Sequence, residues 1–201
     1  MDTISVIGLG YIGLPTALSL AVNGNPVIGT DYNKEVVDEL TNGSIHFTEE
    51  GLQELYEDAV KSEIKFTTNY CQANIYIIAV PTPYEKSNKK VDATYVINAV
   101  KEVLNVCKDE SIIVIESTIS PGTIDKYIRP LIIDRKVHLA HAPERIIPGN
   151  MIKELKNNSR TIGADSVVVA ERVRQLYSTF CKGTIVTTDI RTAEMTKVVE
   201  N

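Results

Sequence analysis

Short continuous apolar runs and longer periodic stretches follow one another along most of this chain. The runs at 4–7, 27–30 and 75–80 are typical of strands that are buried on both faces. The same pattern predicts further strands over 65–67, 111–115, 137–140, 160–163 and 184–186. Apolar residues at helical spacing predict helices after residue 13 and over 34–41, 49–61, 95–106, 121–133, 166–180 and from 192 onward, with a polar loop over 85–90.

This alternation predicts an α/β fold, a Rossmann-like, doubly wound and mainly parallel sheet. We expect residues 1–188 to form that domain and residues 189–201 to begin a central helical segment. The chain stops inside its last predicted helix, with no glycine, proline or polar tail to end it. We therefore expect it to be the N-terminal part of a longer protein.

A glycine turn joins the first predicted strand to the first helix. Gly8, Gly10 and Gly13 have the G-x-G-x-x-G spacing, and the second strand leads directly into Asp31. In such a turn the glycines allow a tight bend and a close approach of the backbone to a pyrophosphate, which the helix N-terminus attracts. Asp31 is placed to accept hydrogen bonds from ribose hydroxyls and to repel a 2′-phosphate, so NAD is the expected cofactor. The alternative is a glycine turn that binds nothing.

Other polar and turn residues follow the later strands. Residues 81–83 (PTP), Thr118 and Glu144 each come at or just after a predicted strand end. Ligands of doubly wound sheets bind at the carboxyl ends of the strands, so these residues are expected to gather near the glycine turn. Taken alone, Thr118 also suits a turn cap and Glu144 a solvated surface position.

Charge and composition exclude several classes of function. The formal net charge is −5 and the lysines are scattered, which argues against a nucleic-acid partner. No apolar run approaches the roughly 18 residues of a membrane span, and the N-terminus leads straight into a strand instead of a signal peptide. The cysteines and histidines lack the spacing of a disulfide framework or a metal site: Cys71, Cys107, Cys181, His46, His138 and His141. A cytoplasmic protein with reduced thiols is expected.

Several motifs, in this order and spacing, make the chain resemble the UDP-glucose/GDP-mannose dehydrogenase family, the nucleotide-sugar 6-dehydrogenases. They are residues 8–15 (GLGYIGLP), 80–83 (VPTP), 116–118 (EST), 121–123 (PGT) and 143–145 (PER), with Glu194, Lys197 and Asn201 on the last predicted helix. Each motif is weak alone, but together they are specific and cover the whole chain.

Two segments resemble the acetamido-sugar branch of the family, namely 143–150 (PERIIPGN) and 191–195 (RTAEM). UDP-glucose enzymes carry an acidic residue where this chain has Pro148. The resemblance therefore favours UDP-N-acetylmannosamine as the sugar substrate, with UDP-N-acetylglucosamine or UDP-glucose as alternatives.

The resemblance also implies a reaction and a set of site residues. Such enzymes oxidise a sugar C6 alcohol to a carboxylate with two NAD molecules, by way of a thioester on a cysteine. It implies catalytic roles for Thr118, Glu144, Lys197 and Asn201, and sugar-nucleotide contacts for Glu144, Arg145, Ile146, Lys197 and Asn201. It implies cofactor contacts for Gly8, Gly10, Tyr11, Ile12, Gly13, Asp31, Val80, Pro81, Thr82 and Thr118.

The family's cysteine lies in a glycine-rich segment that would come after Asn201, so none of the three cysteines here is expected to be the nucleophile. The 201-residue chain is then expected to bind NAD without completing the reaction. In the family a long central helix makes a homodimer, which is the expected state of the full-length protein. Two other readings stay open: a β-hydroxyacid dehydrogenase and a non-catalytic dinucleotide-sensing module.

Overall fold

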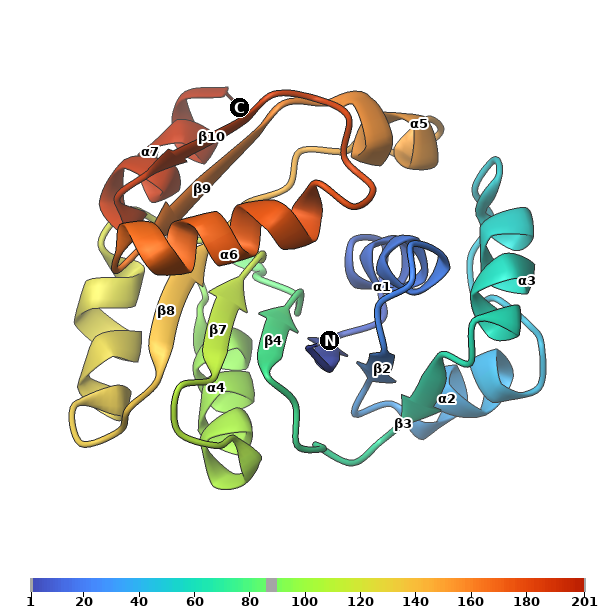
Figure 1. The fold of residues 1–201 in the computed structure, drawn as a ribbon, viewed down its shortest axis with the longest axis horizontal. Coiled ribbons are helices and arrows are strands. Elements are labelled where there is room, and N and C mark those ends of the chain that lie inside the picture. Colours follow the sequence, from blue (N-terminus) through green and yellow to red (C-terminus); the bar gives the residue numbers. More distant parts are fainter. Residues whose placement is uncertain (1, 86–89, 201) are drawn as a thin grey trace.

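A single large sheet organises the structure, a computed structural model that describes residues 2–85 and 90–200 (Figure 1). Its strands are β1 (Ile4–Ile7), β2 (Val27–Thr30), β3 (Lys65–Thr67), β4 (Ile75–Ile78), β7 (Ile112–Ile115), β8 (His138–His141), β9 (Arg160–Ala164) and β10 (Ile185–Thr188). The helices are α1 (Gly13–Val22), α2 (Lys34–Thr41), α3 (Leu52–Lys61), α4 (Thr94–Val106), α5 (Met151–Asn157), α6 (Val167–Tyr177) and α7 (Ile190–Glu200).

The strands are hydrogen-bonded in the order β10-β9-β8-β7-β4-β1-β2-β3. The neighbours from β3 to β8 are all parallel, whereas β9 runs antiparallel to β8 and parallel to β10. From β1 the chain moves outward to β2 and β3, and then returns to the other side of β1 to form β4. The predicted doubly wound, mainly parallel sheet is therefore confirmed, and its topological switch point lies between β1 and β4.

Apolar side chains fill both faces of the sheet, as the continuous apolar runs predict. On one face Ile4 and Val6 of β1 pack with residues of α1, α3 and α6. On the other face Ile7 packs with residues of α4 and with Ile190 of α7. In Figure 1, α6 and α4 lie on the two sides of the strands, and α7 with β10 lies at the opposite end of the sheet from α2 and α3. This burial on both sides is what holds the strand ends in fixed positions.

The element boundaries differ from the sequence prediction in a few places. The helix predicted over 49–61 begins at Leu52, because Gly51 before it has a positive φ of 76°. The helix predicted over 121–133 is a π-helical turn, Ile124–Ile128, followed by a 3₁₀ turn, Arg129–Ile132. Pro130 lies in the latter, where its missing N–H cannot continue an α-helical ladder.

Two features escaped the sequence pattern. Helix α5 has only 7 residues, too few for a helical period to stand out. At the two ends of the loop predicted over 85–90, β5 (Tyr84–Glu85) pairs antiparallel with β6 (Lys90–Val91), while residues 86–89 of that loop lie outside the described residues.

The described part of the chain lacks two kinds of feature. No helix in it is both long enough and apolar enough to cross a membrane. It also contains no cluster of three or more His, Cys, Asp or Glu side chains arranged to hold a metal ion.

Candidate functional site

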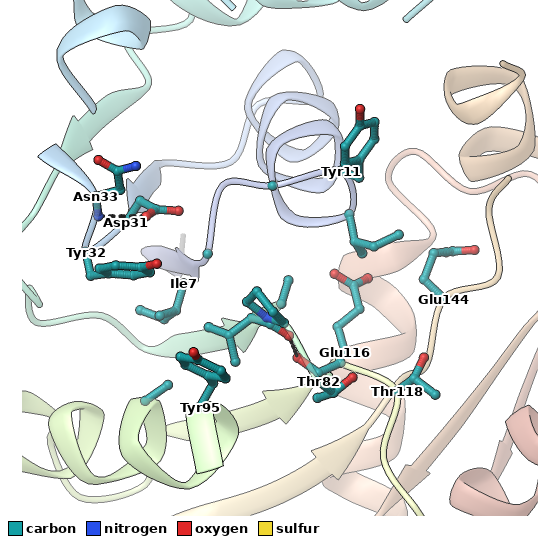
Figure 2. Close-up of a pocket in the computed structure, with 18 of the residues that line it drawn as sticks. Ile7, Tyr11, Asp31, Tyr32, Asn33, Thr82, Tyr95, Glu116, Thr118 and Glu144 are labelled. Atoms are coloured by element: carbon teal, nitrogen blue, oxygen red, sulfur yellow. Dashed lines mark hydrogen bonds between the residues drawn. The ribbon is translucent and has the colours of Figure 1, made fainter. Parts of the chain in front are cut away.

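A cavity of about 870 Å³ opens at the carboxyl ends of β1, β4 and β7. This is the edge of the sheet at which doubly wound folds bind ligands, and the volume lies in the usual range for a ligand pocket. Figure 2 shows two ends to this cavity. Asp31, Tyr32 and Tyr95 lie at one end, and Glu116, Thr118 and Glu144 lie at the other.

The glycine turn between β1 and α1 forms one wall, and each glycine has a different reason to be there. Gly8 has a φ of +90°, and a Cβ on it would lie 2.7 Å from the Ala79 carbonyl oxygen. A Cβ on Gly13 would lie 1.8 Å from the Gly8 carbonyl oxygen. A Cβ on Gly10 would meet no described protein atom within 4 Å, although Gly10 lines the cavity. The protein needs the first two glycines for its own packing, and the open space at Gly10 suits a ligand phosphate.

The start of α1 adds to this cradle. No side chain caps its N-terminus, so the positive end of the helix dipole is left to attract an anion beside the turn, although the Leu14 N–H already donates to the Gly10 carbonyl oxygen. Tyr11, a residue of the turn itself, stacks on Phe47 with ring centroids 4.4 Å apart. The residues present therefore fit the pyrophosphate of a dinucleotide.

Asp31 lies directly after β2, at the far end of the cavity from Glu144 (Figure 2). Its two carboxylate oxygens accept hydrogen bonds from the backbone N–H groups of Leu9, at 2.8 Å, and Asn33, at 2.9 Å. A carboxylate offers about four acceptor positions, so these bonds fix its orientation and leave capacity for ribose hydroxyls. This geometry suits the predicted role of Asp31.

The middle of the cavity is lined by Val80, Pro81 and Thr82 after β4 and by Thr118 after β7. The two segments are joined because the Ser117 hydroxyl donates to the carbonyl oxygen of Val80 at 2.8 Å. This link, together with the proline-restricted backbone, gives the wall between the two ends a defined shape.

Three buried charged side chains meet at the other end. The Arg160 guanidinium of β9 donates through Nη1 to Glu116 Oε1 at 2.7 Å and through Nη2 to Glu144 Oε2. The three side chains are 2%, 0% and 5% exposed, respectively. Glu116 also accepts hydrogen bonds from the hydroxyls of Thr16 and Tyr177. We call Glu116, Arg160 and Glu144 the buried charge cluster.

Burial shifts the acid–base properties of this cluster. Desolvation raises the pKa of the Glu116 carboxyl, and the nearby Arg160 charge opposes that rise. Desolvation likewise raises the pKa of the Tyr177 hydroxyl well above 10, so it remains a neutral donor at pH 7. The Arg160 guanidinium also lies over the Tyr177 ring, 4.2 Å from its centroid.

Helix α7 brings Lys197 to the same cavity. Lys197 is almost fully buried and lines the cavity, and Glu194, one turn earlier, is buried as well. The Glu194 carboxylate accepts hydrogen bonds from the backbone N–H groups of Gly122, at 2.6 Å, and Ile124, at 3.0 Å. This contact anchors α7 to the segment that follows β7. Asn201, which was predicted to lie on the same helix face, is outside the described residues.

The structure brings most of the predicted site residues into one cavity. These are Gly8, Gly10, Tyr11, Ile12, Asp31, Val80, Pro81, Thr82, Thr118, Glu144, Ile146 and Lys197. Gly13 and Arg145 are not among the described residues that line it. Gly13 packs against Gly8, and Arg145 is half-buried beside Glu144, whose Oε1 accepts its backbone N–H at 2.7 Å.

Sequence reasoning missed Arg160 as a site residue and gave Glu116 only as part of a motif. The sequence could have marked Glu116 as a site residue, since it directly follows a buried strand. Arg160 had none, because a lone arginine at the start of a strand carries no local pattern. The two tyrosines at the Asp31 end, Tyr32 and Tyr95, were also not singled out, although both line the cavity.

Comparisons with known proteins agree with this geometry. Residues 2–181 match the family described as "UDP-glucose/GDP-mannose dehydrogenase family, NAD binding domain". The chain is 45% identical over 98% of its length to a UDP-N-acetyl-D-mannosamine dehydrogenase of Methanococcus maripaludis and covers 47% of that protein. It is 38% identical over 99% of its length to the UDP-N-acetyl-D-mannosamine dehydrogenase of Escherichia coli K12 and covers 50% of it.

Solved structures show the same likeness. The structure of UDP-N-acetyl-mannosamine dehydrogenase Cap5O from Staphylococcus aureus superimposes with a TM-score of 0.93 at 39% identity, over 99% of this chain and 50% of that one. A GDP-mannose dehydrogenase from Pseudomonas aeruginosa, solved as a ternary complex, gives a TM-score of 0.91 at 25% identity, over 98% of this chain and 49% of that one. The chain thus spans about half the length of the relatives that it matches.

Proposed function

Because the chain belongs to the UDP-glucose/GDP-mannose dehydrogenase family and carries its NAD-binding domain, we propose that the full-length protein oxidises the C6 alcohol of a UDP-N-acetylhexosamine to the uronate. The observation that carries this proposal is the two-ended cavity. A dinucleotide cradle lies at one end, and buried charged groups suited to acid–base chemistry lie at the other (Figure 2).

NAD, when bound, supplies the hydride acceptor for alcohol oxidation. The chain's part is to hold and orient it. The turn at Gly8 and Gly10 and the N-terminus of α1 would bind the pyrophosphate, and Asp31 would accept the adenosine ribose hydroxyls. Val80 and Thr82 would wall the cofactor and direct its nicotinamide toward the end that holds Thr118.

At that end, the polar groups suit the reacting C6 atom of a sugar. The Lys197 ammonium would stabilise negative charge that develops on the substrate oxygen. The Glu144 carboxylate would take a proton from the water that attacks the acyl group in the last step. Thr118 would position that water. Asn201, Arg145 and Ile146 keep the substrate contacts that the family resemblance implies.

The choice of sugar rests on two points. Several relatives are named UDP-N-acetyl-D-mannosamine dehydrogenases. Residue 148 is Pro, where the family resemblance implies an acidic residue in UDP-glucose enzymes. We therefore favour UDP-N-acetylmannosamine, with UDP-N-acetylglucosamine as the alternative to test beside it. The catalytic cysteine and the remainder of a homodimer-forming central helix would come from sequence after residue 201, and the protein would work in the cytoplasm.

The test uses the full-length protein with NAD and each of UDP-N-acetylmannosamine, UDP-N-acetylglucosamine and UDP-glucose, and follows NADH absorbance. We expect turnover with UDP-N-acetylmannosamine to produce two NADH per uronate. Lys197→Ala should lower kcat by about 10²–10³, which is typical of losing one electrostatic donor at a reacting centre. Lys61→Ala is the matched control, because Lys61 is exposed and pairs with Asp58 on α3, away from the cavity. No NADH with any of the three sugars would contradict the proposal.

A further inference from the structure

We propose that Arg160 is the positioning residue for the Glu144 carboxylate, and that Glu116, on the other branch of the same guanidinium, controls the charge that Glu144 experiences. The inference rests on the proposed function, in which Glu144 takes a proton from water. It adds two residues, Arg160 and Glu116, to which sequence motifs assign no such role.

The geometry of the guanidinium supports this directly. Nη1 donates to Glu116 and Nη2 donates to Glu144, so one planar group holds two carboxylates at a set spacing. The Oε1 of Glu144 accepts a backbone N–H from Arg145, which fixes the second oxygen. The Glu144 side chain therefore has both oxygens oriented before a substrate arrives.

The charge balance makes the two carboxylates depend on each other. With both ionised, the cluster holds two negative charges against one positive charge, and its members are at most 5% exposed. Burial raises the pKa of Glu116. The two carboxylates share the single Arg160 charge, so the negative charge on Glu116 weakens the stabilisation that Arg160 gives to ionised Glu144.

Stability alone is a poor explanation for this arrangement. Apolar replacements of buried ion pairs are often neutral or stabilising, because the charges must be desolvated. Here both carboxylates line the ligand cavity, beside Thr118 and Lys197. Perturbed ionisable groups that lie in a cavity of this kind are frequently functional.

The groups packed around Glu144 come from several elements and must be considered together. Glu116 follows β7, Arg160 begins β9, Tyr177 ends α6, and Lys197 of α7 lines the same cavity. Tyr177 donates a neutral hydrogen bond to Glu116, so the charges that change on substitution are those of Glu116 and Arg160.

Glu116→Gln is the decisive variant because it removes a charge and keeps the shape. Its amide oxygen can still accept from Arg160 and Tyr177, and its amide N–H can donate to the Thr16 hydroxyl. With Arg160 left to Glu144 alone, the midpoint at which Glu144 titrates should fall by about one pH unit or more. Arg160→Lys, which loses the two-branched fork, should move this midpoint in the opposite direction.

The midpoints are measured by NMR titration of the protein carrying ¹³C-carboxyl glutamate, with the Glu144 signal assigned from its loss in Glu144→Gln. Arg172→Gln is the matched control, because it removes an arginine–carboxylate pair with Asp2 that is partly exposed and remote from the cavity. We expect no movement of the Glu144 midpoint in that control. Thermal melts establish that each variant is folded.

Kinetics of the full-length protein separate this inference from the proposed function. The acid side of the kcat–pH profile should move to lower pH in Glu116→Gln, with NAD affinity changed less than threefold. A Glu144 midpoint that stays in place or rises in Glu116→Gln, in an enzyme that turns over normally, overturns the inference alone. If the wild-type protein oxidises no UDP-sugar, the proposed function is wrong, and so is the proposal that Arg160 positions Glu144 for catalysis.

Discussion

The Asp31 carboxylate is held in place by the backbone before it meets any ligand. Both of its oxygens accept N–H groups from neighbouring turns, one of them from Leu9 inside the glycine turn. A single side chain therefore joins the end of β2 to the turn after β1. It presents a negative charge where the adenosine ribose of NAD would lie.

We expect Asp31→Ala to weaken NADH binding about thirtyfold, which corresponds to a loss of about 2 kcal/mol. NADPH binding should be weak in the wild type, because the carboxylate repels a 2′-phosphate, and should improve relative to NADH in the variant. Fluorescence titrations with both cofactors provide the measurement. Equal wild-type affinity for NADH and NADPH would refute this role of Asp31.

His141 shows what complete burial does to one side chain. It is 0% exposed at the end of β8, and its Nδ1–H donates to the Ile115 carbonyl oxygen at 2.8 Å. Desolvation lowers its pKa from 6.5 to about 4. The folded protein thus keeps a neutral imidazole at a pH where the unfolded chain has already taken up a proton.

The direction of the pH effect follows from that difference. As the pH falls from about 6.5 to about 4, the unfolded state gains a proton that the folded state does not, so His141 should lower the free energy of unfolding by up to about 3 kcal/mol. Urea melts across this range should show a flatter pH dependence for His141→Gln than for the wild type. Exposed His46→Gln is the control, and an unchanged slope in His141→Gln would be the contrary result.

At the scale of elements, the β1–turn–α1 unit separates packing from binding. Gly13 and Gly8 touch each other so closely that a side chain on Gly13 has no space, whereas Gly10 faces open space in the cavity. The turn is therefore close-packed on its protein side and open on the side where we expect the pyrophosphate to bind.

Two alanine substitutions separate these functions. Gly13→Ala should destabilise the protein by about 3 kcal/mol or more, because the methyl group would overlap a backbone carbonyl that cannot move aside. Gly10→Ala should leave the melting temperature close to that of the wild type, yet weaken NADH binding by about tenfold or more, about 1.4 kcal/mol. Thermal melts and NADH titrations of both variants provide the check. Normal NADH affinity in a folded Gly10→Ala protein would place the pyrophosphate elsewhere.

At the scale of the whole molecule, residues near both ends of the described chain line the same cavity. Helix α7 packs against β8 and β9, and Glu194 ties it to the segment after β7, so Lys197 reaches the cavity built on β1 and β4. None of the three cysteines is among the described residues that line this cavity. Cys107 and Cys181 are buried, and Cys71 is partly buried.

We therefore expect the 201-residue chain by itself to bind NADH without oxidising a sugar nucleotide. The measurement is an NADH titration beside an absorbance assay with UDP-N-acetylmannosamine and NAD. Sustained formation of the uronate would show that one of the three cysteines acts as the nucleophile after all.

Much of the fold could be read from local pattern because its elements are continuous in sequence. The parallel strands are buried on both faces, so they read as unbroken apolar runs, and the doubly wound sheet that these runs predict is confirmed. The pattern was least informative where an element is short or irregular, as in α5 and in the π-helical turn at Ile124–Ile128. The domain boundary at residues 188 and 189 and the individual catalytic roles stay predictions.

The dinucleotide site is largely a property of the sequence itself. Gly8, Gly10, Gly13 and Asp31 lie in one strand–turn–helix–strand unit, whose local geometry follows from glycine freedom, helix polarity and strand length. The buried charge cluster was decided only by tertiary structure. Arg160 meets partners 44 and 16 residues away in sequence, and their burial depends on how β7, β9 and α6 pack. Desolvation and charge pairing arise only in that packing, so no local sequence pattern could predict them.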